Sequence, residues 1–233
     1  MKRALPGGFL LAIEGIDGAG KSFQAQAVAR VLEDRGLDVV LTREPTQGRW
    51  GRLLRESMTK GRLSPADELN AFLEDRKEHV RDLIRPALAA GRIVITDRYY
   101  FSTVAYQGAA GFDPQELLRL NEAIALEPHL LVLIDLDPAV SLARIGRRDG
   151  RTNEFETLGQ LQRSRDIFLG LRKPYLLTLD GTASPGDLRD RILYELGRAF
   201  VARLESEPRL TAREKLEACL AFHGAPPSAA PPA

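Results

Sequence analysis

The segment from Gly15 to Ser22 constrains this chain more than any other feature of its sequence. It follows an apolar run, Phe9 to Ile13, and opens an amphipathic segment, Phe23 to Arg35. Its spacing matches G-x-x-x-x-G-K-[ST], a loop that binds phosphate between a buried strand and a helix. Glycines let successive N–H groups point at an anion, and the following helix adds the positive end of its dipole. We therefore predict a nucleotide site rather than a glycine-rich turn that binds nothing, and its expected phosphate-binding residues are Gly15, Ile16, Asp17, Gly18, Ala19, Gly20, Lys21 and Ser22.

Three side chains are predicted to act on the nucleotide and its metal ion. Lys21 is placed to reach the β- and γ-phosphates, and the Ser22 hydroxyl to ligate Mg²⁺. Asp97 ends another apolar run, where it can hold the same ion directly or through water. The sequence thus predicts ATP and Mg²⁺, with Ser22 and Asp97 as metal ligands.

The overall composition excludes several classes of protein. The formal net charge of the 233 residues is +1, which gives no long-range bias toward nucleic acid or membrane. Cys219 is the only cysteine, so an internal disulfide is impossible. No apolar run approaches the ~20 residues of a membrane span, and the run at Phe9 leads directly into the phosphate loop instead of a cleavage site. We expect a soluble cytoplasmic protein that binds neither nucleic acid nor membrane.

Continuous apolar runs alternate along the chain with amphipathic segments, which indicates an α/β fold with a five-stranded parallel sheet and helices on both faces. We expect helix breaks at Pro86 and near Ile145, and a disordered Pro/Ala-rich tail over 224–233. One domain should cover 1–205, with a lid at about 146–153, and 206–233 should form an extension. The expected strands are 9–14, 38–42, 92–96, 130–136 and 175–179, and the expected helices are 22–35, 50–59, 65–85, 115–125, 138–145, 158–171, 185–203 and 211–223.

Charged residues follow two further strands at the sheet edge where ligands gather in α/β proteins. Arg43 and Glu44 follow the second strand, either as part of a site or as a solvated charge pair. Asp97 and Arg98 follow the third strand, and the Arg98 guanidinium group can donate two parallel hydrogen bonds to a phosphate. Ser102 and Tyr106 come next and share one helical face, with Gln107 beside them.

Arg76 interrupts the apolar stripe of the helix expected over 65–85. A buried guanidinium group without a partner would cost several kcal/mol. Either Arg76 pairs with a carboxylate of the protein, or this face lines a pocket whose ligand supplies the acceptor. Phe72 lies one turn earlier and offers either an aromatic face to that ligand or simple core packing.

Arginines gather again at positions 144, 147, 148 and 151, around Gly146 and Gly150. Such a run is often only a solvated loop. In an enzyme that transfers phosphoryl groups, an arginine loop hinged by glycines can instead close over the phosphates and stabilise charge in the transition state.

Taken together, these motifs resemble the thymidylate kinase family over about residues 9–200. The distinctive block is Asp97-Arg98-Tyr99-x-x-Ser102-x-x-Ala105-Tyr106-Gln107-Gly108, beside the phosphate loop, Arg43-Glu44-Pro45 and Phe72…Arg76. The resemblance implies a homodimeric P-loop NTPase-like fold that transfers the γ-phosphoryl group of ATP to dTMP with Mg²⁺. It implies that Phe72 stacks on thymine, Arg76 bonds its carbonyl edge, and Arg98 and Arg43 hold the dTMP phosphate. It further implies contacts of Asp17 with the 3′-hydroxyl, of Tyr106 near the 2′ position, and of Ser102 and Gln107 in the nucleoside pocket.

The resemblance also bears on the catalytic arginine. Gly18 stands where one branch of the family has an arginine, so the sequence resembles the bacterial type with its arginine in the lid. We expect Arg147 or Arg148, rather than Arg151, to act with Lys21 and Arg98 in catalysis. Two departures from the family pattern are Phe23, in place of a second Ser or Thr, and Thr46-Gln47-Gly48 after Pro45.

The proposed chemistry needs no general base, because the second pKa of a phosphate monoester is about 6 and the attacking oxygen is already largely anionic near pH 7. Two other functions stay open from the sequence. A GTPase-like binding protein would need a guanine-reading motif such as N-K-x-D, which the sequence lacks. A deoxynucleoside kinase would need a carboxylate base, for which Glu14 is the candidate.

Overall fold

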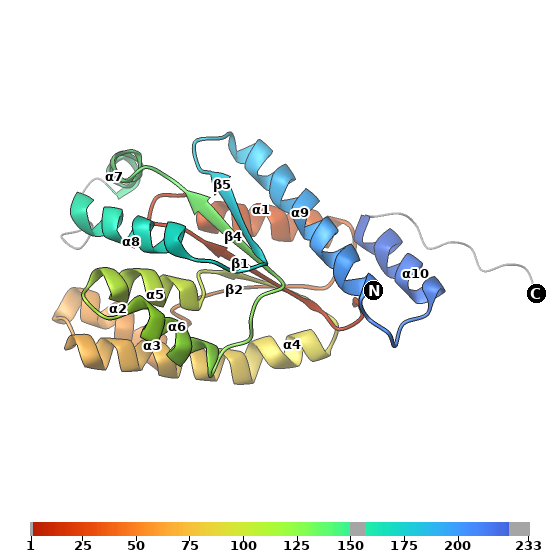
Figure 1. Ribbon diagram of the computed structural model, residues 1–233, viewed down its shortest axis with the longest axis horizontal. Coiled ribbons are helices and arrows are strands. Elements are labelled where there is room, and N and C mark those ends of the chain that lie inside the picture. Colours follow the sequence, from red (N-terminus) through yellow and green to blue (C-terminus); the bar gives the residue numbers. More distant parts are fainter. Residues whose placement is uncertain (1, 150–156, 224–233) are drawn as a thin grey trace, which may run out of the picture.

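The computed structural model describes residues 2–149 and 157–223. Its centre is a five-stranded parallel sheet in the order β2-β3-β1-β4-β5 (Figure 1). The expected α/β architecture is confirmed, because continuous apolar runs form strands that are covered on both faces. The strands are β1 (Phe9–Glu14), β2 (Val39–Arg43), β3 (Ile93–Asp97), β4 (Leu130–Asp135) and β5 (Leu176–Asp180).

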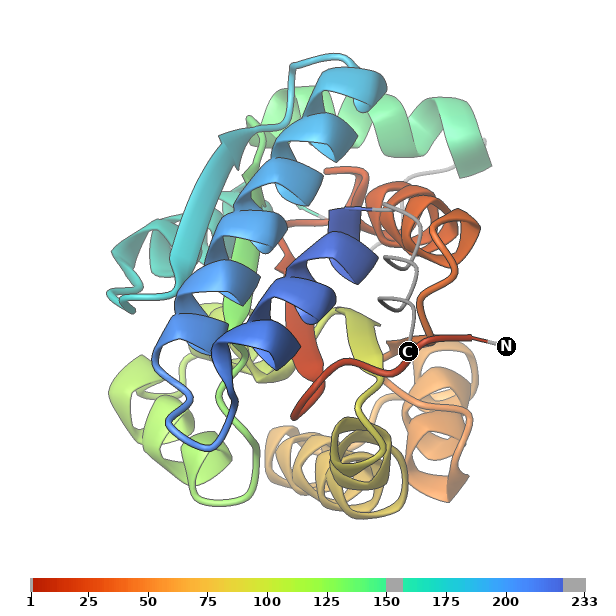
Figure 2. The ribbon, with the colours of Figure 1, turned by 90° about the vertical axis from the view of Figure 1, so that its right-hand side faces the viewer.

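Helices cover both faces of the sheet, so the molecule has three layers (Figures 1 and 2). Alternate residues of β1 point to opposite layers: Leu11 packs with α1, α9 and α10, while Leu10 packs with the layer that contains α4, α5, α6 and α8. The helices are α1 (Lys21–Asp34), α2 (Arg49–Lys60), α3 (Pro65–His79), α4 (Arg85–Ala89), α5 (Tyr100–Ala109), α6 (Pro114–Glu122), α7 (Pro138–Asp149), α8 (Leu158–Gly170), α9 (Pro185–Glu205) and α10 (Ala212–His223).

The strand register brings the three charged strand ends to one edge of the sheet. Arg43 pairs with Asp97 across β2 and β3, and Ile13 pairs with Asp97 across β1 and β3. The phosphate loop leaves β1 directly after Glu14, at the same level. This common edge confirms the expectation that the motifs converge, because the carboxyl ends of parallel strands lie side by side.

Pro86 does not end the long helix, which corrects the sequence expectation. Between α3 and α4 the chain makes one wide π-helical segment, η1 (Val80–Ile84), in which the Arg85 N–H donates to the Val80 carbonyl. Pro86 then lies in the first turn of α4, where its missing N–H has no partner to lose. The wide turn therefore carries the helix past a proline that would break a regular one.

Gly146 does not end α7 either, because the helix continues to Asp149. The lid expected at about 146–153 thus begins as helix, and its remaining residues lie outside the described part of the chain, as does the tail over 224–233. At the other end of the molecule, the helix of the expected extension packs into the core. Phe222 of α10 stacks on Phe200 of α9 with ring centroids 5.1 Å apart.

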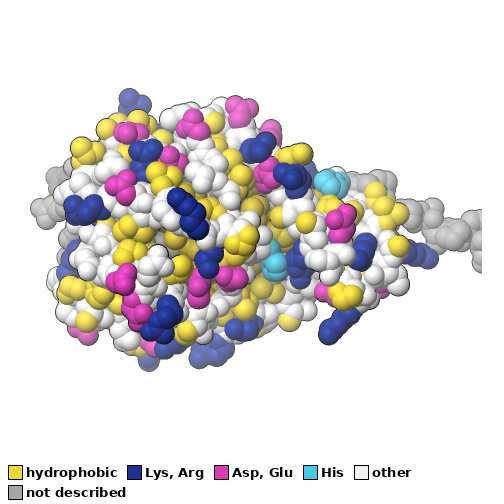
Figure 3. Space-filling model, viewed as in Figure 1, with side chains coloured by type: hydrophobic (Ala, Val, Ile, Leu, Met, Phe, Trp, Pro, Cys, Tyr) yellow, Lys and Arg dark blue, Asp and Glu magenta, His cyan; other side chains and the backbone are white. Residues whose placement is uncertain are grey.

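Basic and acidic side chains are interspersed over the face shown in Figure 3, in agreement with the small net charge. In the parts of the chain that the structure describes, every helix is too short or too polar to cross a membrane.

Candidate active site

The phosphate loop adopts backbone conformations that its glycines permit. Gly15 has φ 142°, and a Cβ there would lie 2.4 Å from the Ile134 carbonyl oxygen. Gly18 has φ 78°, and a Cβ there would lie 2.8 Å from the carbonyl oxygen of Ser141 of α7, whose hydroxyl donates to the Asp17 carbonyl. Larger residues at either glycine would push the loop away from β4 or α7, and Gly20, the second glycine of the motif, is required by its own positive φ of 97°.

Lys21 is buried at the start of α1 and bends back over the loop. Its Nζ donates to the Ile16 carbonyl at 2.7 Å and lies 4.0 Å from Asp17 Oδ1. Burial lowers the pKa of Lys21 to about 8, and the neighbouring Arg98 adds to the shift, while Asp17 and Asp97 oppose it. A negatively charged phosphate in this position would favour the charged ammonium group.

Ser22 and Asp97, the predicted metal ligands, lie together. The Ser22 hydroxyl donates to Asp97 Oδ2, while Asp97 Oδ1 is buried and has no hydrogen-bond partner among the described residues. A buried carboxylate oxygen without a partner is costly unless a ligand or ion satisfies it. The donor set, one carboxylate and one hydroxyl, fits Mg²⁺, which takes its remaining oxygens from water and substrate phosphates.

Arg98 follows β3 in a left-handed conformation, with φ 69°. Its guanidinium group pairs with Asp17 Oδ1, donates to the Ser102 hydroxyl at 3.1 Å, and lies 5.3 Å from the centre of the Tyr106 ring. The Tyr106 hydroxyl donates to Asp17 Oδ2 and accepts the Asp17 N–H, both at 3.0 Å. The predicted phosphate and sugar ligands therefore form one connected group.

The charges in this group reinforce one another. Burial acts to raise the pKa of Asp17, but the Arg98 and Lys21 charges outweigh it and hold that pKa well below its usual range. Burial acts to lower the pKa of Arg98, but the Asp17 carboxylate reverses this and raises it. Asp17 is thus a carboxylate and Arg98 a cation at any pH at which the protein works.

Arg76 has a carboxylate partner, which confirms the first alternative that the sequence left open, and it also lines a cleft; a contact with a ligand there stays a prediction. The side chain is 1% exposed, and its Nε and Nη2 donate to Glu44 Oε2. Nη1 donates to Asn121 Oδ1 and Nη2 to the Thr103 hydroxyl. These bonds use four of the five guanidinium N–H groups, which leaves one on Nη1 in the described part of the chain.

Glu44 is therefore not a member of a solvated pair, since it is 4% exposed and also accepts from His79 Nδ1 at 2.9 Å. The His79 Nε2 lies 2.8 Å from the Thr42 hydroxyl. Burial acts to raise the pKa of Glu44, but Arg76 and His79 more than offset it and lower that pKa. The sequence assigned no role to His79, and the structure makes it the second partner of this carboxylate.

Gln107 presents a free acceptor in the described structure. Its Nε2 donates to Glu68 Oε2 at 3.1 Å, and its Oε1 is buried without a partner. Since a carboxylate only accepts, Glu68 fixes the orientation of the amide and leaves Oε1 to accept from a ligand.

All eight residues predicted to bind the acceptor substrate line one cleft of about 300 Å³ between α2, α3 and α5. This volume is at the lower end of the range for small-molecule sites. A larger hollow of about 590 Å³ lies between α1, α9 and α10, but it contains none of the predicted site residues. The lining of the cleft includes Asp17, Arg43, Phe72, Arg76, Arg98, Ser102, Tyr106 and Gln107, together with Glu44, Pro45, Arg55, Met58, Arg62, Glu68, Tyr99 and Thr103.

Thr46, which departs from the family pattern, fixes the loop after β2 to α3 through hydrogen bonds. Its N–H and hydroxyl both donate to Asp75 of α3, at 2.7 and 2.6 Å. Arg55 of α2 donates to the Pro45 and Thr46 carbonyls from the other side. Gly51 lets α2 approach, because a Cβ there would lie 1.9 Å from the Thr46 carbonyl oxygen.

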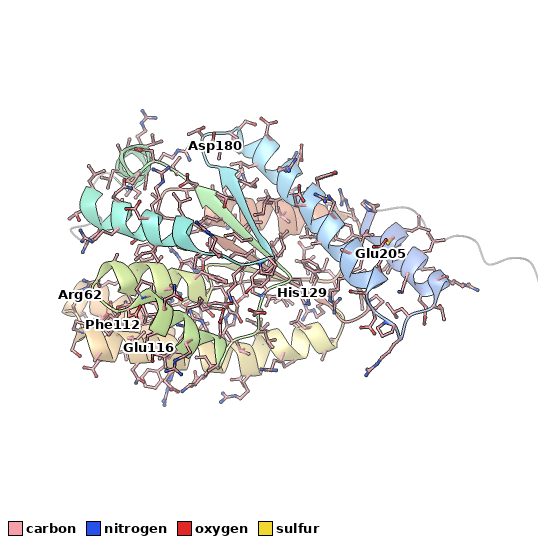
Figure 4. The ribbon with its side chains drawn as sticks, in the orientation of Figure 1. Arg62, Phe112, Glu116, His129, Asp180 and Glu205 are labelled. Atoms are coloured by element: carbon pink, nitrogen blue, oxygen red, sulfur yellow. The ribbon has the colours of Figure 1, made fainter. Side chains whose placement is uncertain are left out.

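The sequence did not single out Arg55, Met58, Arg62 or Glu68, which also line the cleft. Arg62 lies at the end of the molecule formed by α2 and α3 in Figure 4. The only sequence signal for these residues is their place just before and after the Ser64 N-cap of α3. That position alone does not indicate contact with a ligand.

The predicted lid arginines lie at the end of α7 and beyond it. Arg147 is exposed near the end of α7, Arg148 lies in the same helix, and Arg151 lies outside the described residues. Which of them acts in catalysis stays a prediction.

Comparison with known proteins gives consistent matches over most of the chain. The family model described as thymidylate kinase matches residues 13–192. A thymidylate kinase of Xanthomonas campestris pv. campestris (strain B100) is 49% identical over 89% of both chains. One of Xanthomonas oryzae pv. oryzae (strain PXO99A) is 50% identical over 85% of this chain and 86% of its own. One of Xylella fastidiosa (strain M12) is 49% identical over 77% of this chain and 82% of its own.

Proposed function

The chain belongs to the thymidylate kinase family, and on that premise we propose how its residues share the work of the family's reaction. It phosphorylates dTMP to dTDP with ATP as the donor. The single observation that supports the assignment of residues is the cleft beside the phosphate loop, which brings together all eight predicted substrate ligands.

In our proposal, the thymine base is read by one donor and one acceptor. The remaining N–H of Arg76 Nη1 donates to the O4 carbonyl, and Gln107 Oε1 accepts the N3–H. Cytosine has an amino group at position 4 and an acceptor at N3, so it would place donor against donor and acceptor against acceptor. Phe72 stacks on the ring, and Asp17 and Tyr106 face the sugar.

The reaction brings two anionic phosphates together, and fixed positive charges in the site offset their repulsion. Arg98 and Arg43 hold the dTMP phosphate, and Lys21 together with the loop N–H groups holds the β- and γ-phosphates of ATP. To receive the dTMP phosphate, the Arg98 guanidinium exchanges part of its contact with Asp17 for the phosphate oxygens. Because the attacking oxygen is already ionised, orientation and charge stabilisation are the residues' whole contribution.

Mg²⁺ would be held by Ser22 and by Asp97, directly or through water, and it would neutralise charge on the β- and γ-phosphates. The buried Asp97 Oδ1 without a partner among the described residues supports this assignment. We further propose Arg147 or Arg148 as the lid arginine, a cytoplasmic homodimer, and a catalytic domain over 1–205 with residues 206–233 as its extension.

Glu14 does not support the rival deoxynucleoside kinase activity. Its carboxylate is fully buried, accepts three hydrogen bonds from α5, and does not line the cleft. A general base must reach the proton that it removes.

The decisive experiment measures ADP release with dTMP, dUMP, dCMP, AMP and thymidine as acceptors. We expect the highest kcat/KM for dTMP and the strongest rejection for dCMP. Turnover of thymidine without turnover of dTMP would refute the proposal, and equal turnover of dCMP and dTMP would refute the assigned base contacts.

The role of Arg76 needs its own variant, because alanine would leave Glu44 buried and unpaired. Arg76→Lys keeps the charge but loses the planar fork, so KM for dTMP should rise about tenfold to hundredfold while KM for ATP stays unchanged. Lys77→Ala, at the neighbouring exposed position, is the control. A purely structural Arg76 would give an unfolding defect with an unchanged KM for dTMP.

A further inference from the structure

Glu14 is a buried carboxylate for which the proposed chemistry has no direct use. It ends β1, a strand whose other five residues are apolar, and its exposure is 0%. An ionised group in such a place is costly unless hydrogen bonds and opposite charges compensate it. The contacts of Glu14 therefore indicate what it does.

Both oxygens of Glu14 accept from the start of α5. Oε1 accepts the N–H groups of Tyr99 at 2.7 Å and Ser102 at 2.9 Å, and Oε2 accepts the Ser102 hydroxyl at 2.6 Å. Tyr99, the N-cap residue of α5, contributes no capping side chain of its own among the described contacts. Glu14 thus caps α5 from another element of the fold, where the helix dipole also favours a negative charge.

The turn that Glu14 closes is the one that carries Arg98. The Arg98 N–H donates to the Ile13 carbonyl at 3.0 Å, and its carbonyl accepts the Thr96 hydroxyl at 2.6 Å. The left-handed conformation is unfavourable for a residue other than glycine, so surrounding contacts must hold it. The bond from the Tyr99 N–H to Glu14 fixes the next peptide group of the same turn.

A second connection runs through side chains. The Ser102 hydroxyl donates to Glu14 Oε2 and accepts from Arg98 Nη1 at 3.1 Å. Burial raises the pKa of Glu14 to about 7, while the Ser102 hydroxyl and the Arg98 and Lys21 charges act to lower it. Glu14 is thus linked to Arg98 through the backbone, through Ser102 and through charge.

We propose that Glu14 is a positioning residue for phosphoryl transfer, which aims the Arg98 guanidinium at the acceptor phosphate through the Tyr99 N–H and the Ser102 hydroxyl. The inference rests on the proposed function, in which Arg98 holds the phosphate of dTMP. It gives the carboxylate at the end of β1 a role in binding the acceptor without contact with it.

The test compares Glu14→Gln, Arg98→Ala and the double variant in steady-state kinetics. The glutamine amide nitrogen donates and cannot accept, so one of the two acceptor oxygens that hold the turn is lost. We expect Glu14→Gln to raise KM for dTMP about tenfold to hundredfold, as loss of a supporting contact does in other sites, and to leave KM for ATP within about twofold. In the Arg98→Ala background, the same change should add little, because the two residues act as a unit.

His129→Gln is the matched control. His129 is a polar side chain that also bonds β1, accepting the Leu10 N–H at 2.8 Å, but at the end of the strand remote from the phosphate loop. The His129→Gln variant should have a lower midpoint of thermal unfolding and an unchanged KM for dTMP. If Glu14→Gln behaves in the same way, Glu14 is structural and the inference is overturned.

Two further outcomes separate the inference from the function on which it rests. An unchanged KM for dTMP in Arg98→Ala would refute the assignment of Arg98, whereas a raised KM there with a wild-type KM in Glu14→Gln would refute only the role of Glu14. Glu14→Asp replaces Glu14→Gln as the test variant if the glutamine variant does not fold. It keeps the charge but withdraws the oxygens by one methylene, so a wild-type KM for dTMP in this variant would also overturn the inference.

Discussion

Two regions of the molecule are stabilised in opposite ways. Toward α1, α9 and α10 the sheet meets a continuous apolar layer in which Phe9, Phe200 and Phe222 pack together. At the carboxyl edge and along α3, the buried side chains are mostly polar or charged. In this second region, the buried polar and charged residues include Glu14, Lys21, Glu44, Glu68, Asp75, Arg76, His79 and Asp97.

In Figure 4, Arg62 lies at the end of the molecule formed by α2 and α3, Glu205 lies toward the opposite end, and His129 lies between them. Burying apolar surface stabilises the fold, whereas burying charge costs free energy even when each charge has a partner. The comparison indicates that burial in the apolar layer stabilises the fold, and that the buried charges at the carboxyl edge lower the net free energy of unfolding. Substitutions in the two regions should therefore have separable effects on unfolding and on catalysis.

The largest effect should come from the apolar layer. Phe200 is fully buried, so Phe200→Ala should lower the free energy of unfolding by about 3–5 kcal/mol through lost burial and a cavity. Urea denaturation measures this loss, and kinetics of the folded fraction should show unchanged KM values. A loss below about 1 kcal/mol would contradict the contrast.

At the charged edge, the expected change is in catalysis. Lys21→Met should lower kcat about 10²–10³-fold, as removal of a donor to transition-state charge does in other enzymes. Since burial lowers the pKa of Lys21, which means that the folded protein disfavours its charge, the variant should unfold no more readily than wild type at pH 7. A large loss of stability would show that Lys21 serves the fold as well.

A smaller effect should appear as a pH dependence of the unfolding free energy, caused by His129 at the far end of β1. Burial, assisted by Arg203, lowers the pKa of His129 to about 4. The unfolded chain takes up the proton near pH 6.5, so the stability that neutral His129 contributes is complete above that pH. It is lost as the pH falls toward 4, by at most about 3 kcal/mol.

The measurement is the difference in unfolding free energy between wild type and His129→Gln over pH 4 to 8. This difference isolates His129 from Glu14, whose raised pKa acts in the opposite direction between about pH 4.5 and 7. A difference that does not change with pH would contradict the prediction.

Local spacing was enough to predict the strands, the phosphate loop and eight of the residues that line the cleft. Each of these depends on a short motif and on the rule that the carboxyl ends of parallel strands converge. The interruption of the apolar stripe by Arg76 was informative for the same reason, although the sequence could not choose between its two explanations. The structure shows the carboxylate partner, and Arg76 also lines the cleft.

The partners of those residues could not be predicted, because their burial arises from contacts between distant segments. Asn121 and Glu44 meet Arg76 from 45 and 32 residues away. Glu68, Asp75 and His79 make the buried face of α3 mostly polar, so its periodicity does not reveal which side is inside. The continuation of α7 past Gly146 had no local signal, since one glycine weakens a helix without ending it.

The wide turn at Val80–Ile84 has a consequence for how this chain can change over time. It holds one residue more than a regular helix would need between Arg76 and Ala87. A regular helix built from the same number of residues would rotate one half by ~100° against the other. Arg76 would then leave the cleft or Ala87 would leave the core, so the wide turn keeps both faces in place. Loss of one residue within this turn should therefore be tolerated better than loss of one residue within α3.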